Sequence, residues 1–192
     1  MKSVLLSSFF ISFFLFTSTQ SAFAHFHYEA GATTELKTNK DGKLSALDIS
    51  WVYDPEVTDM MLKDNDDLKE FGEGLIKDLA KLSYFTKLKL NAKVIKTSKV
   101  ETYKLEKVGK DEDTRLKLSF TLPLETPVAL KGKTTLLIDH TDTSASAIIY
   151  YDTATSISFD KTLDPHCIAD VKDKKDYEHG ETPQLVNVFC EI

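Results

Sequence analysis

The sequence predicts an α+β fold that is mainly β, in which an antiparallel, sandwich-like sheet carries one inserted amphipathic helix. Three observations lead to this prediction. Apolar and polar residues alternate through most of the chain, which is the pattern of half-buried strands. Turn residues separate these segments at short intervals, as in β-sandwiches. A single segment, at about residues 65–82, instead repeats its apolar residues every three or four positions.

The first two predicted strands, residues 26–36 and 43–53, form a hairpin, because the Asn39-Lys40-Asp41-Gly42 stretch between them has turn chemistry. We expect its first strand to lie at the edge of the sheet. A short helical turn at 56–63 then leads into the helix at 65–82, for which Asn65 or Asp66 is the predicted N-cap. Further strands are predicted over residues 88–97, 100–108, 115–122, 134–139, 147–151, 156–159 and 185–190. Residues 172–183 are predicted to form an exposed loop.

The amino end has the features of a secretory signal peptide. Lys2 precedes an apolar run from Val4 to Phe16, and Ala22-Phe23-Ala24 has the small residues that a signal peptidase accepts. The run is about 13 residues long, whereas a membrane-spanning helix needs about 20. We therefore interpret residues 1–24 as a signal peptide and 25–192 as a single periplasmic β-rich domain that begins at His25.

Composition and motifs exclude several classes of function. The formal charge of −6, with lysines spread among acidic residues, argues against nucleic acid as a partner, since phosphate binding needs clustered positive charge. The sequence contains no G-x-S-x-G, G-x-G-x-x-G, Walker or H-E-x-x-H motif. We therefore predict that the protein is not an enzyme.

The chain has two cysteines, Cys167 and Cys190. In an oxidising compartment such a pair most simply forms a disulfide, worth roughly 3 kcal/mol in the chain-entropy model. The alternative, a pair of thiolate metal ligands, lacks the usual C-x-x-C spacing.

Histidines and acidic residues suggest a metal site. After cleavage, His25 would offer a free α-amine beside its imidazole, and His27 would be the third residue of the mature chain. An amine followed by a third-position histidine binds Cu(II) or Ni(II) in a square plane through deprotonated amides. If a sheet instead engages those amides, the imidazoles favour tetrahedral Zn(II) with ligands from elsewhere. His140 and Asp142 follow a predicted apolar strand and are the best candidates to complete the set.

Several segments, in order along residues 22–160, resemble a known family. They are "AHFHYEA", "KLSALDISWVYD", "MMLKDND" and "IIYYDTATSISFD". Together they are similar to a periplasmic family of uncharacterised function, whose members are commonly described as the periplasmic component of an ABC-type transport system. In gene context these members are similar to accessory proteins of zinc, nickel and cobalt transporters. The resemblance supports a role for His25 and His27; members usually have Pro between the two histidines, where this chain has Phe26.

These observations lead to one main functional hypothesis and two alternatives. We expect an exported accessory protein that captures Zn or Ni and hands it over to an integral-membrane metal transporter. The first alternative is a copper-binding protein or oxidase that uses an N-terminal histidine brace. The second is an interaction module in which metal has no part.

Overall fold

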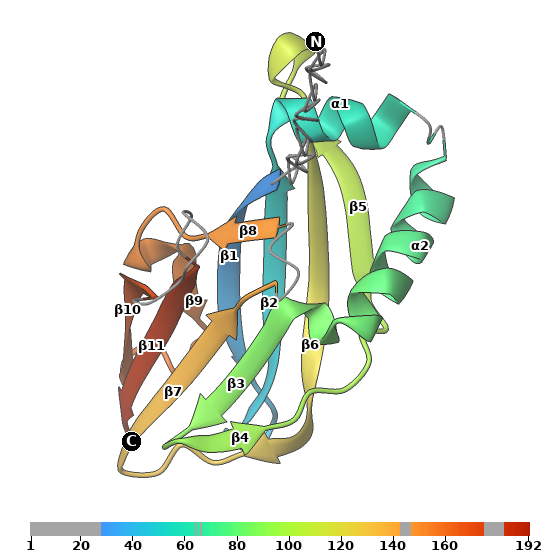
Figure 1. Cartoon of the computed structure of the whole chain (residues 1–192). Helices are drawn as coiled ribbons and strands as arrows, with labels where there is room; N and C mark the ends of the chain where they lie inside the picture. The colour runs from blue at the N-terminus through green and yellow to red at the C-terminus, as the bar shows by residue number, and fades with distance from the viewer. Residues whose placement is uncertain (1–27, 64, 66, 143–146, 175–182) are drawn as a thin grey trace, which may run out of the picture.

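The computed structural model describes residues 28–63, 65, 67–142, 147–174 and 183–192. Within these ranges the chain forms eleven strands and two α-helices (Figure 1). The strands are β1 (Tyr28–Thr38), β2 (Leu44–Tyr53), β3 (Thr86–Leu90), β4 (Lys93–Ile95), β5 (Tyr103–Val108), β6 (Arg115–Val128), β7 (Lys133–His140), β8 (Ala147–Tyr150), β9 (Ile157–Phe159), β10 (Cys167–Asp173) and β11 (Gln184–Glu191). The helices are α1 (Pro55–Lys63) and α2 (Leu68–Lys81). The prediction of an α+β, mainly β fold is confirmed.

The first sheet has the order β5-β6-β2-β1-β8, and β9 also pairs with β1. The predicted hairpin is present, because β1 and β2 are antiparallel neighbours joined by the turn at residues 39–43. The expectation that the first strand lies at an edge is wrong: β1 lies between β2 on one side and the parallel strands β8 and β9 on the other. The sandwich is therefore mixed rather than purely antiparallel.

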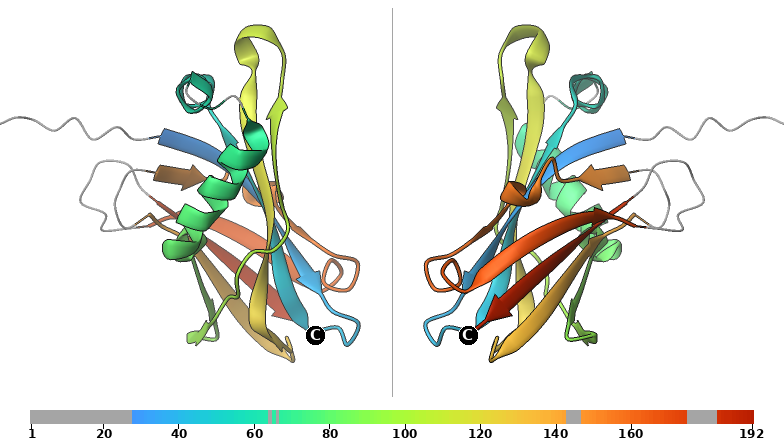
Figure 2. Two further views of the ribbon diagram at one scale, coloured as in Figure 1. Left: turned by 90° about the vertical axis from the view of Figure 1, so that its right-hand side faces the viewer. Right: turned by 90° about the vertical axis from the view of Figure 1, so that its left-hand side faces the viewer.

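The second sheet has the order β10-β11-β7-β3-β4, and its pairs are all antiparallel. The two sheets form two layers that cross at an angle (Figure 2). The core lies between them, where Trp51 of β2 stacks on the ring of Phe85 next to β3. Toward β5 the helix α2 takes the place of the second sheet, and Gly72 packs against Tyr103 and Leu105.

Helix α2 begins and ends close to the predicted bounds. Its N-cap, however, is Asp67 rather than Asn65 or Asp66, because the Asp67 carboxylate accepts hydrogen bonds from the backbone N–H groups of Lys69 (2.8 Å) and Glu70 (3.2 Å). The apolar spacing predicts a buried stripe of Leu68, Phe71, Leu75, Leu79 and Leu82; of these the helix buries Leu79 in the core, together with Ile76, whereas Leu82 is 48% exposed.

Two strand predictions differ from the structure. Residues 88–97 form the hairpin of β3 and β4 rather than one strand, since Asn91 and Ala92 adopt positive φ angles of 46° and 67° and reverse the chain. Residues 167–173 form β10, which extends into the segment predicted as a loop, because each of its residues pairs with β11. Lys174 and Pro183 of that segment are joined by a backbone hydrogen bond, and residues 175–182 lie outside the described residues.

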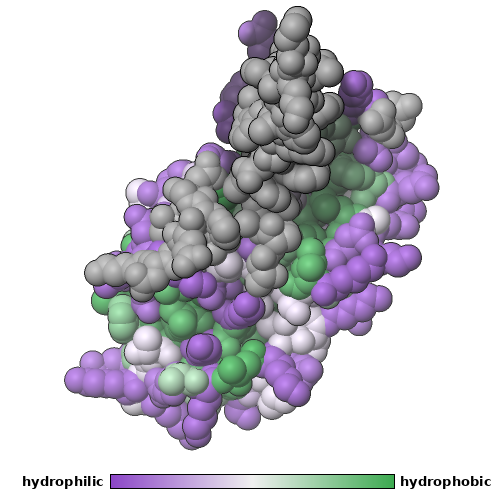
Figure 3. Space-filling view, viewed as in Figure 1, coloured by the Kyte–Doolittle hydropathy of each residue, from purple (hydrophilic) through white to green (hydrophobic). Residues whose placement is uncertain are grey.

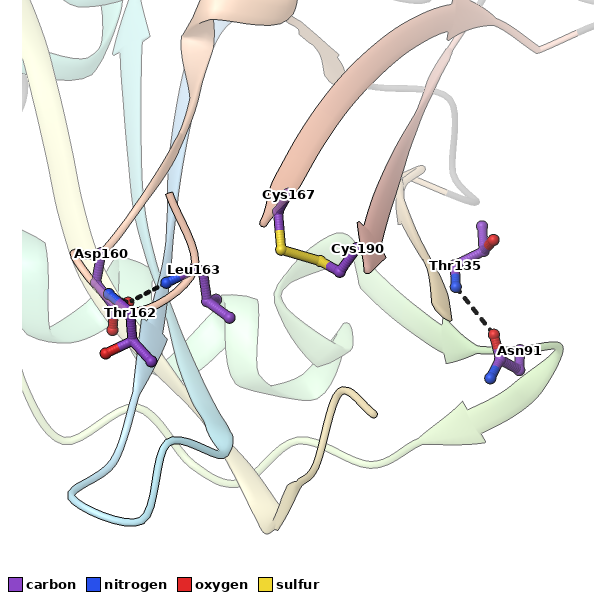
Figure 4. Close-up of a disulfide and its surroundings, with 7 residues drawn as sticks. All are labelled: Asn91, Thr135, Asp160, Thr162, Leu163, Cys167 and Cys190. Atoms are coloured by element: carbon purple, nitrogen blue, oxygen red, sulfur yellow. Dashed lines mark hydrogen bonds between the residues drawn. A yellow bond between two sulfur atoms is a disulfide. The ribbon is translucent and has the colours of Figure 1, made fainter. Parts of the chain in front are cut away.

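The predicted disulfide between Cys167 and Cys190 is present (Figure 4). The two cysteines face each other in the register of β10 and β11, so the bond ties the start of one strand to the end of the other. No helix in the described ranges is long and apolar enough to cross a membrane.

Candidate metal site

The predicted ligand His140 is the last residue of β7 and points into the core. Side chains alternate along a strand, and β7 buries Thr134, Leu136, Ile138 and His140 on its inner face. The His140 side chain is 2% exposed. Its ring lies between Trp51 of β2, with ring centroids 6.4 Å apart, and Tyr151 after β8, with centroids 5.8 Å apart.

Hydrogen bonds assign the tautomer of His140. The Thr86 hydroxyl donates its only hydrogen to the carbonyl oxygen of Tyr84, at 2.7 Å. The same hydroxyl lies 2.9 Å from His140 Nδ1; with its hydrogen on the shorter bond to Tyr84 it accepts from the ring, and on this basis we assign the proton to Nδ1. The other ring nitrogen, Nε2, therefore carries a lone pair. This arrangement, a histidine that donates through one nitrogen and offers the other, is typical of metal ligands.

The Nε2 atom of His140 is buried and has no hydrogen-bond partner in the described part of the chain. Such an atom costs free energy unless something binds to it. The indole nitrogen of Trp51 is the other buried side-chain atom without a partner in those ranges, and its ring packs edge-on against the His140 ring. Within the described ranges, His140 Nε2 is thus a buried acceptor without a donor, and the neighbouring Trp51 indole N–H is a buried donor without an acceptor.

Burial also fixes the charge state of His140. Desolvation lowers the pKa of His140 to about 4, against the carboxylate of Asp139, which raises it. The ring is therefore neutral at pH 7, and a metal ion would not have to displace a proton from Nε2.

The predicted ligand Asp142 is buried two residues beyond His140, with 3% of its surface exposed. Its carboxylate accepts a hydrogen bond from the backbone N–H of Ala147, at 3.0 Å, and so helps to start β8. Burial, followed by the charge of Asp142, raises the pKa of Tyr28 to about 12. Tyr28 is the first described residue of β1 and pairs with Ala147.

Asp139, by contrast, belongs to the outer face of the sheet. It alternates with His140 along β7, and it accepts hydrogen bonds from the Thr141 hydroxyl and from Lys174 Nζ, the latter at 3.2 Å. These contacts hold its carboxylate on the opposite side of the strand from the His140 ring.

The predicted ligands His25 and His27 lie outside the described residues. Among the residues that are described, no group of three or more His, Cys, Asp or Glu side chains is placed to hold a metal ion. His140 and Asp142 therefore do not make a complete site with any third described side chain.

The comparison with known families assigns the chain. Residues 10–184 match the model of a family described as a protein of unknown function (DUF1007). The chain belongs to this family. No curated protein shows a significant match to it. The DUF1007 match ends at the first residue of β11 and includes the other ten strands of the described ranges, among them those that carry His140 and its neighbours.

One residue of this DUF1007 protein that supports the His140 ring, Thr86, was not predicted from the sequence. Thr86 fixes the tautomer, and Thr86 is held in turn by an unusual backbone: Ser83, Tyr84 and Phe85 all have φ angles near +50° (53°, 53° and 50°). A left-handed conformation costs roughly 1–2 kcal/mol for each such residue. Left-handed backbone is usually predicted from glycine or asparagine, and residues 83–85 contain neither. The sequence therefore does not predict this turn.

Proposed function

We propose that this protein binds a divalent transition-metal ion outside the cytoplasm and passes it to an integral-membrane transporter. The observation that carries the proposal is the Nε2 atom of His140, which is buried, neutral at pH 7 and without a partner in the described ranges. A core histidine kept only for packing would normally have both ring nitrogens satisfied. The disulfide supports export, because such bonds persist in oxidising compartments.

The proposed ligand set joins His140 and Asp142 to His25 and His27. His27 directly precedes Tyr28 in the sequence, and His25 is separated from Tyr28 by two residues. At about 3.5 Å per residue, these histidines attach within roughly 10 Å of the start of β1. The start of β1 is near Asp142, because Tyr28 pairs with Ala147, whose backbone N–H donates to the Asp142 carboxylate. An imidazole pair with a carboxylate and a further imidazole suits Zn(II) or Ni(II).

The proposal places one demand on the backbone. Tyr28 and the even-numbered residues of β1 after it point into the core, since Ala30, Ala32 and Thr34 are buried. If the strand continued to alternate toward the amino end, His25 and His27 would face outward with Glu29. Metal binding together with His140 therefore requires the chain to leave strand geometry before Tyr28. That departure would also release the amides that square-planar Ni(II) or Cu(II) coordination uses.

Titration calorimetry of the exported protein with Zn, Ni and Cu(II) tests the proposal. We expect tight binding of at least one metal, weakened by at least about tenfold in His140→Gln and in the double variant H25A/H27A. His166→Ala is the matched control, because His166 is an exposed histidine beside the disulfide, and it should leave the affinity unchanged. If no metal binds, or if the control weakens binding as much as His140→Gln does, the proposal is wrong.

Two further measurements refine the result. Mass spectrometry of the exported protein determines whether its first residue is His25, which the amine ligand requires. The EPR spectrum of the copper form would identify a histidine brace, in which the amine and ring of His25 and a second imidazole bind copper. Thr86→Val should lower the metal affinity by roughly 10- to 100-fold, because it removes the acceptor that fixes the His140 tautomer.

A further inference from the structure

A hairpin in the second sheet carries a local excess of positive charge. From Leu82 to Val100 the sequence contains five lysines and no acidic residue, although the whole chain has a formal charge of −6. The five lie on β3, on β4 or directly after β4, and they are Lys87, Lys89, Lys93, Lys96 and Lys99. We call residues 86–99 the basic hairpin. Figure 1 shows β3 and β4 at the end of the molecule away from the turn between β5 and β6.

The lysines of the basic hairpin are free to meet an anionic partner. All five are exposed, and none of them forms an ion pair within the described ranges. Two carboxylates lie near them. Glu125 is on the wall of the same groove as Lys96. Asp139 pairs with Lys87 in the register of β3 and β7, but its carboxylate also accepts a hydrogen bond from Lys174. The hairpin therefore keeps an excess of positive charge, which attracts anions.

Exposed apolar side chains lie among these lysines. Val94, in the middle of β4, is 72% exposed, more than any other large apolar side chain in the described part of the chain. It pairs with Lys89 across the hairpin, so both side chains lie on the outer face of the sheet. Leu82, which is 48% exposed, lines a groove of about 550 Å³ together with Val94 and Lys96. In Figure 3, which has the same viewpoint as Figure 1, hydrophobic side chains emerge among hydrophilic ones in the lower part of the molecule.

The backbone on both sides of the basic hairpin is already paired. β3 pairs with β7, and the chain after β4 is bonded to the end of β6. There the Glu125 N–H donates to the Lys96 carbonyl oxygen at 3.0 Å. The Ser98 N–H donates to the Pro123 carbonyl oxygen at 2.8 Å. A partner therefore meets the side chains of the hairpin, presented on a fixed backbone, rather than its main chain.

We propose that the basic hairpin docks the protein on a membrane surface that contains anionic phospholipids. The lysines reach the lipid phosphates, and Val94 and Leu82 enter the boundary between headgroups and acyl chains. In interfacial membrane binding, electrostatic attraction and the burial of apolar side chains act together. A site for one small soluble anion would instead hold its lysines in place by hydrogen bonds, whereas no described residue accepts a hydrogen bond from these ammonium groups.

Sedimentation with vesicles tests this proposal on the exported protein. The probes are vesicles of phosphatidylcholine alone and vesicles of equimolar phosphatidylcholine and phosphatidylglycerol. We expect binding to the mixed vesicles only. Each lysine near an anionic surface contributes about fivefold to such binding, so K89E/K96E should weaken it by at least about tenfold. K107E/K110E gives the same net charge but changes exposed lysines beside the turn between β5 and β6, and it should leave binding within about twofold. Circular dichroism verifies that both variants are folded.

A second measurement follows the apolar contact. In Val94→Trp, the added indole should be quenched by mixed vesicles whose acyl chains carry bromine. The wild type should not be quenched, because its own Trp51 is 1% exposed.

Several results would overturn the proposal. They are equal binding to the two kinds of vesicle, an equal loss in K89E/K96E and K107E/K110E, and an absence of quenching in Val94→Trp. Binding of soluble polyglutamate as tight as that of the mixed vesicles would also overturn it, because the partner would then be an acidic polypeptide. So would a lack of any vesicle binding, in which case the lysines only keep this end of the sheet in water. None of these outcomes bears on metal binding.

Discussion

Acidification should destabilise the metal-free protein through the ring of His140. The ring is buried and neutral, and burial lowers its pKa to about 4, while the nearby Asp139 carboxylate raises it. In the unfolded chain a histidine has a pKa of about 6.5. Between these two values the unfolded state binds a proton that the folded state does not bind. The stability that depends on His140 is therefore complete above about pH 6.5 and is lost as the pH falls toward 4.

The size of the effect follows from the two pKa values. Proton linkage gives a loss of about 2 kcal/mol between about pH 7.5 and pH 5, and a limiting loss of roughly 3 kcal/mol at lower pH. A loss of this size is a large fraction of the stability of a typical domain. At about pH 5 most carboxylates are still ionised, so the histidine contribution can be separated from acid denaturation.

Urea denaturation followed by the fluorescence of Trp51 measures this loss. Trp51 is the only tryptophan in the sequence and is 1% exposed, so its emission reports the opening of the core around His140. The measurement is made with a chelator at about pH 7.5 and pH 5, on the wild type and on His140→Phe. The variant keeps an aromatic ring but has no group that titrates. The difference in pH dependence between the two proteins isolates His140.

The reasoning is refuted if that difference is less than about 0.5 kcal/mol, well below the linkage estimate. It is also refuted if NMR shows His140 titrating near its ordinary pKa of about 6.5, because the ring would then be solvated rather than buried.

Three other predictions concern stability, each measured by urea denaturation. Replacing Cys167 and Cys190 by serine should cost about 3 kcal/mol, given their separation of 23 residues, and a reductant should then have no further effect on the variant. Asp160→Ala should cost about 2 kcal/mol, because it removes the acceptor for backbone N–H groups of the β1 end and of its own turn, whereas Asp160→Asn should cost less. Gly74→Ala should stabilise by about 0.5–1 kcal/mol, since nothing lies within 4 Å of the added carbon. Gly72→Ala should not, because that carbon would lie 3.2 Å from a tyrosine ring. A stabilising Gly72→Ala would show that α2 packs more loosely than described.

Features set by neighbours in the sequence were the predictable part of this fold. The β1–β2 hairpin follows from alternation and from the turn around Gly42, whose φ of 70° suits glycine. Helix α2 follows from the spacing of residues such as Phe71, Leu75 and Leu79. In both cases the pattern lies within a single segment, so no knowledge of distant contacts is needed.

Elements that depend on distant pairing could not be predicted in the same way. β10 forms because it pairs with β11 along its whole length, although its own residue Ile168 is 70% exposed and blurs the alternation. The turn between β3 and β4 uses Asn91 and Ala92 in left-handed conformations, and alanine gives no signal of this. Asn91 is held there by hydrogen bonds to Thr135 of β7.

The candidate site likewise has one part that local sequence predicts and one part that depends on distant contacts. The sequence predicts His140 and Asp142 as site residues because binding residues are often located in loops that follow an apolar strand. It cannot show that His140 is buried, or that its tautomer is fixed by Thr86, which lies 54 residues earlier. The contribution of His25 and His27 stays a prediction.

β1 leaves the ribosome early, yet it is completed late. Its parallel partners are Ala147–Tyr150 and Ile157–Phe159, so one side of the strand has no ladder until almost the whole polypeptide has been synthesised. Contacts this distant in sequence also slow folding. Until that point the backbone N–H and C=O groups on this side of β1 remain without a strand partner and are open to water.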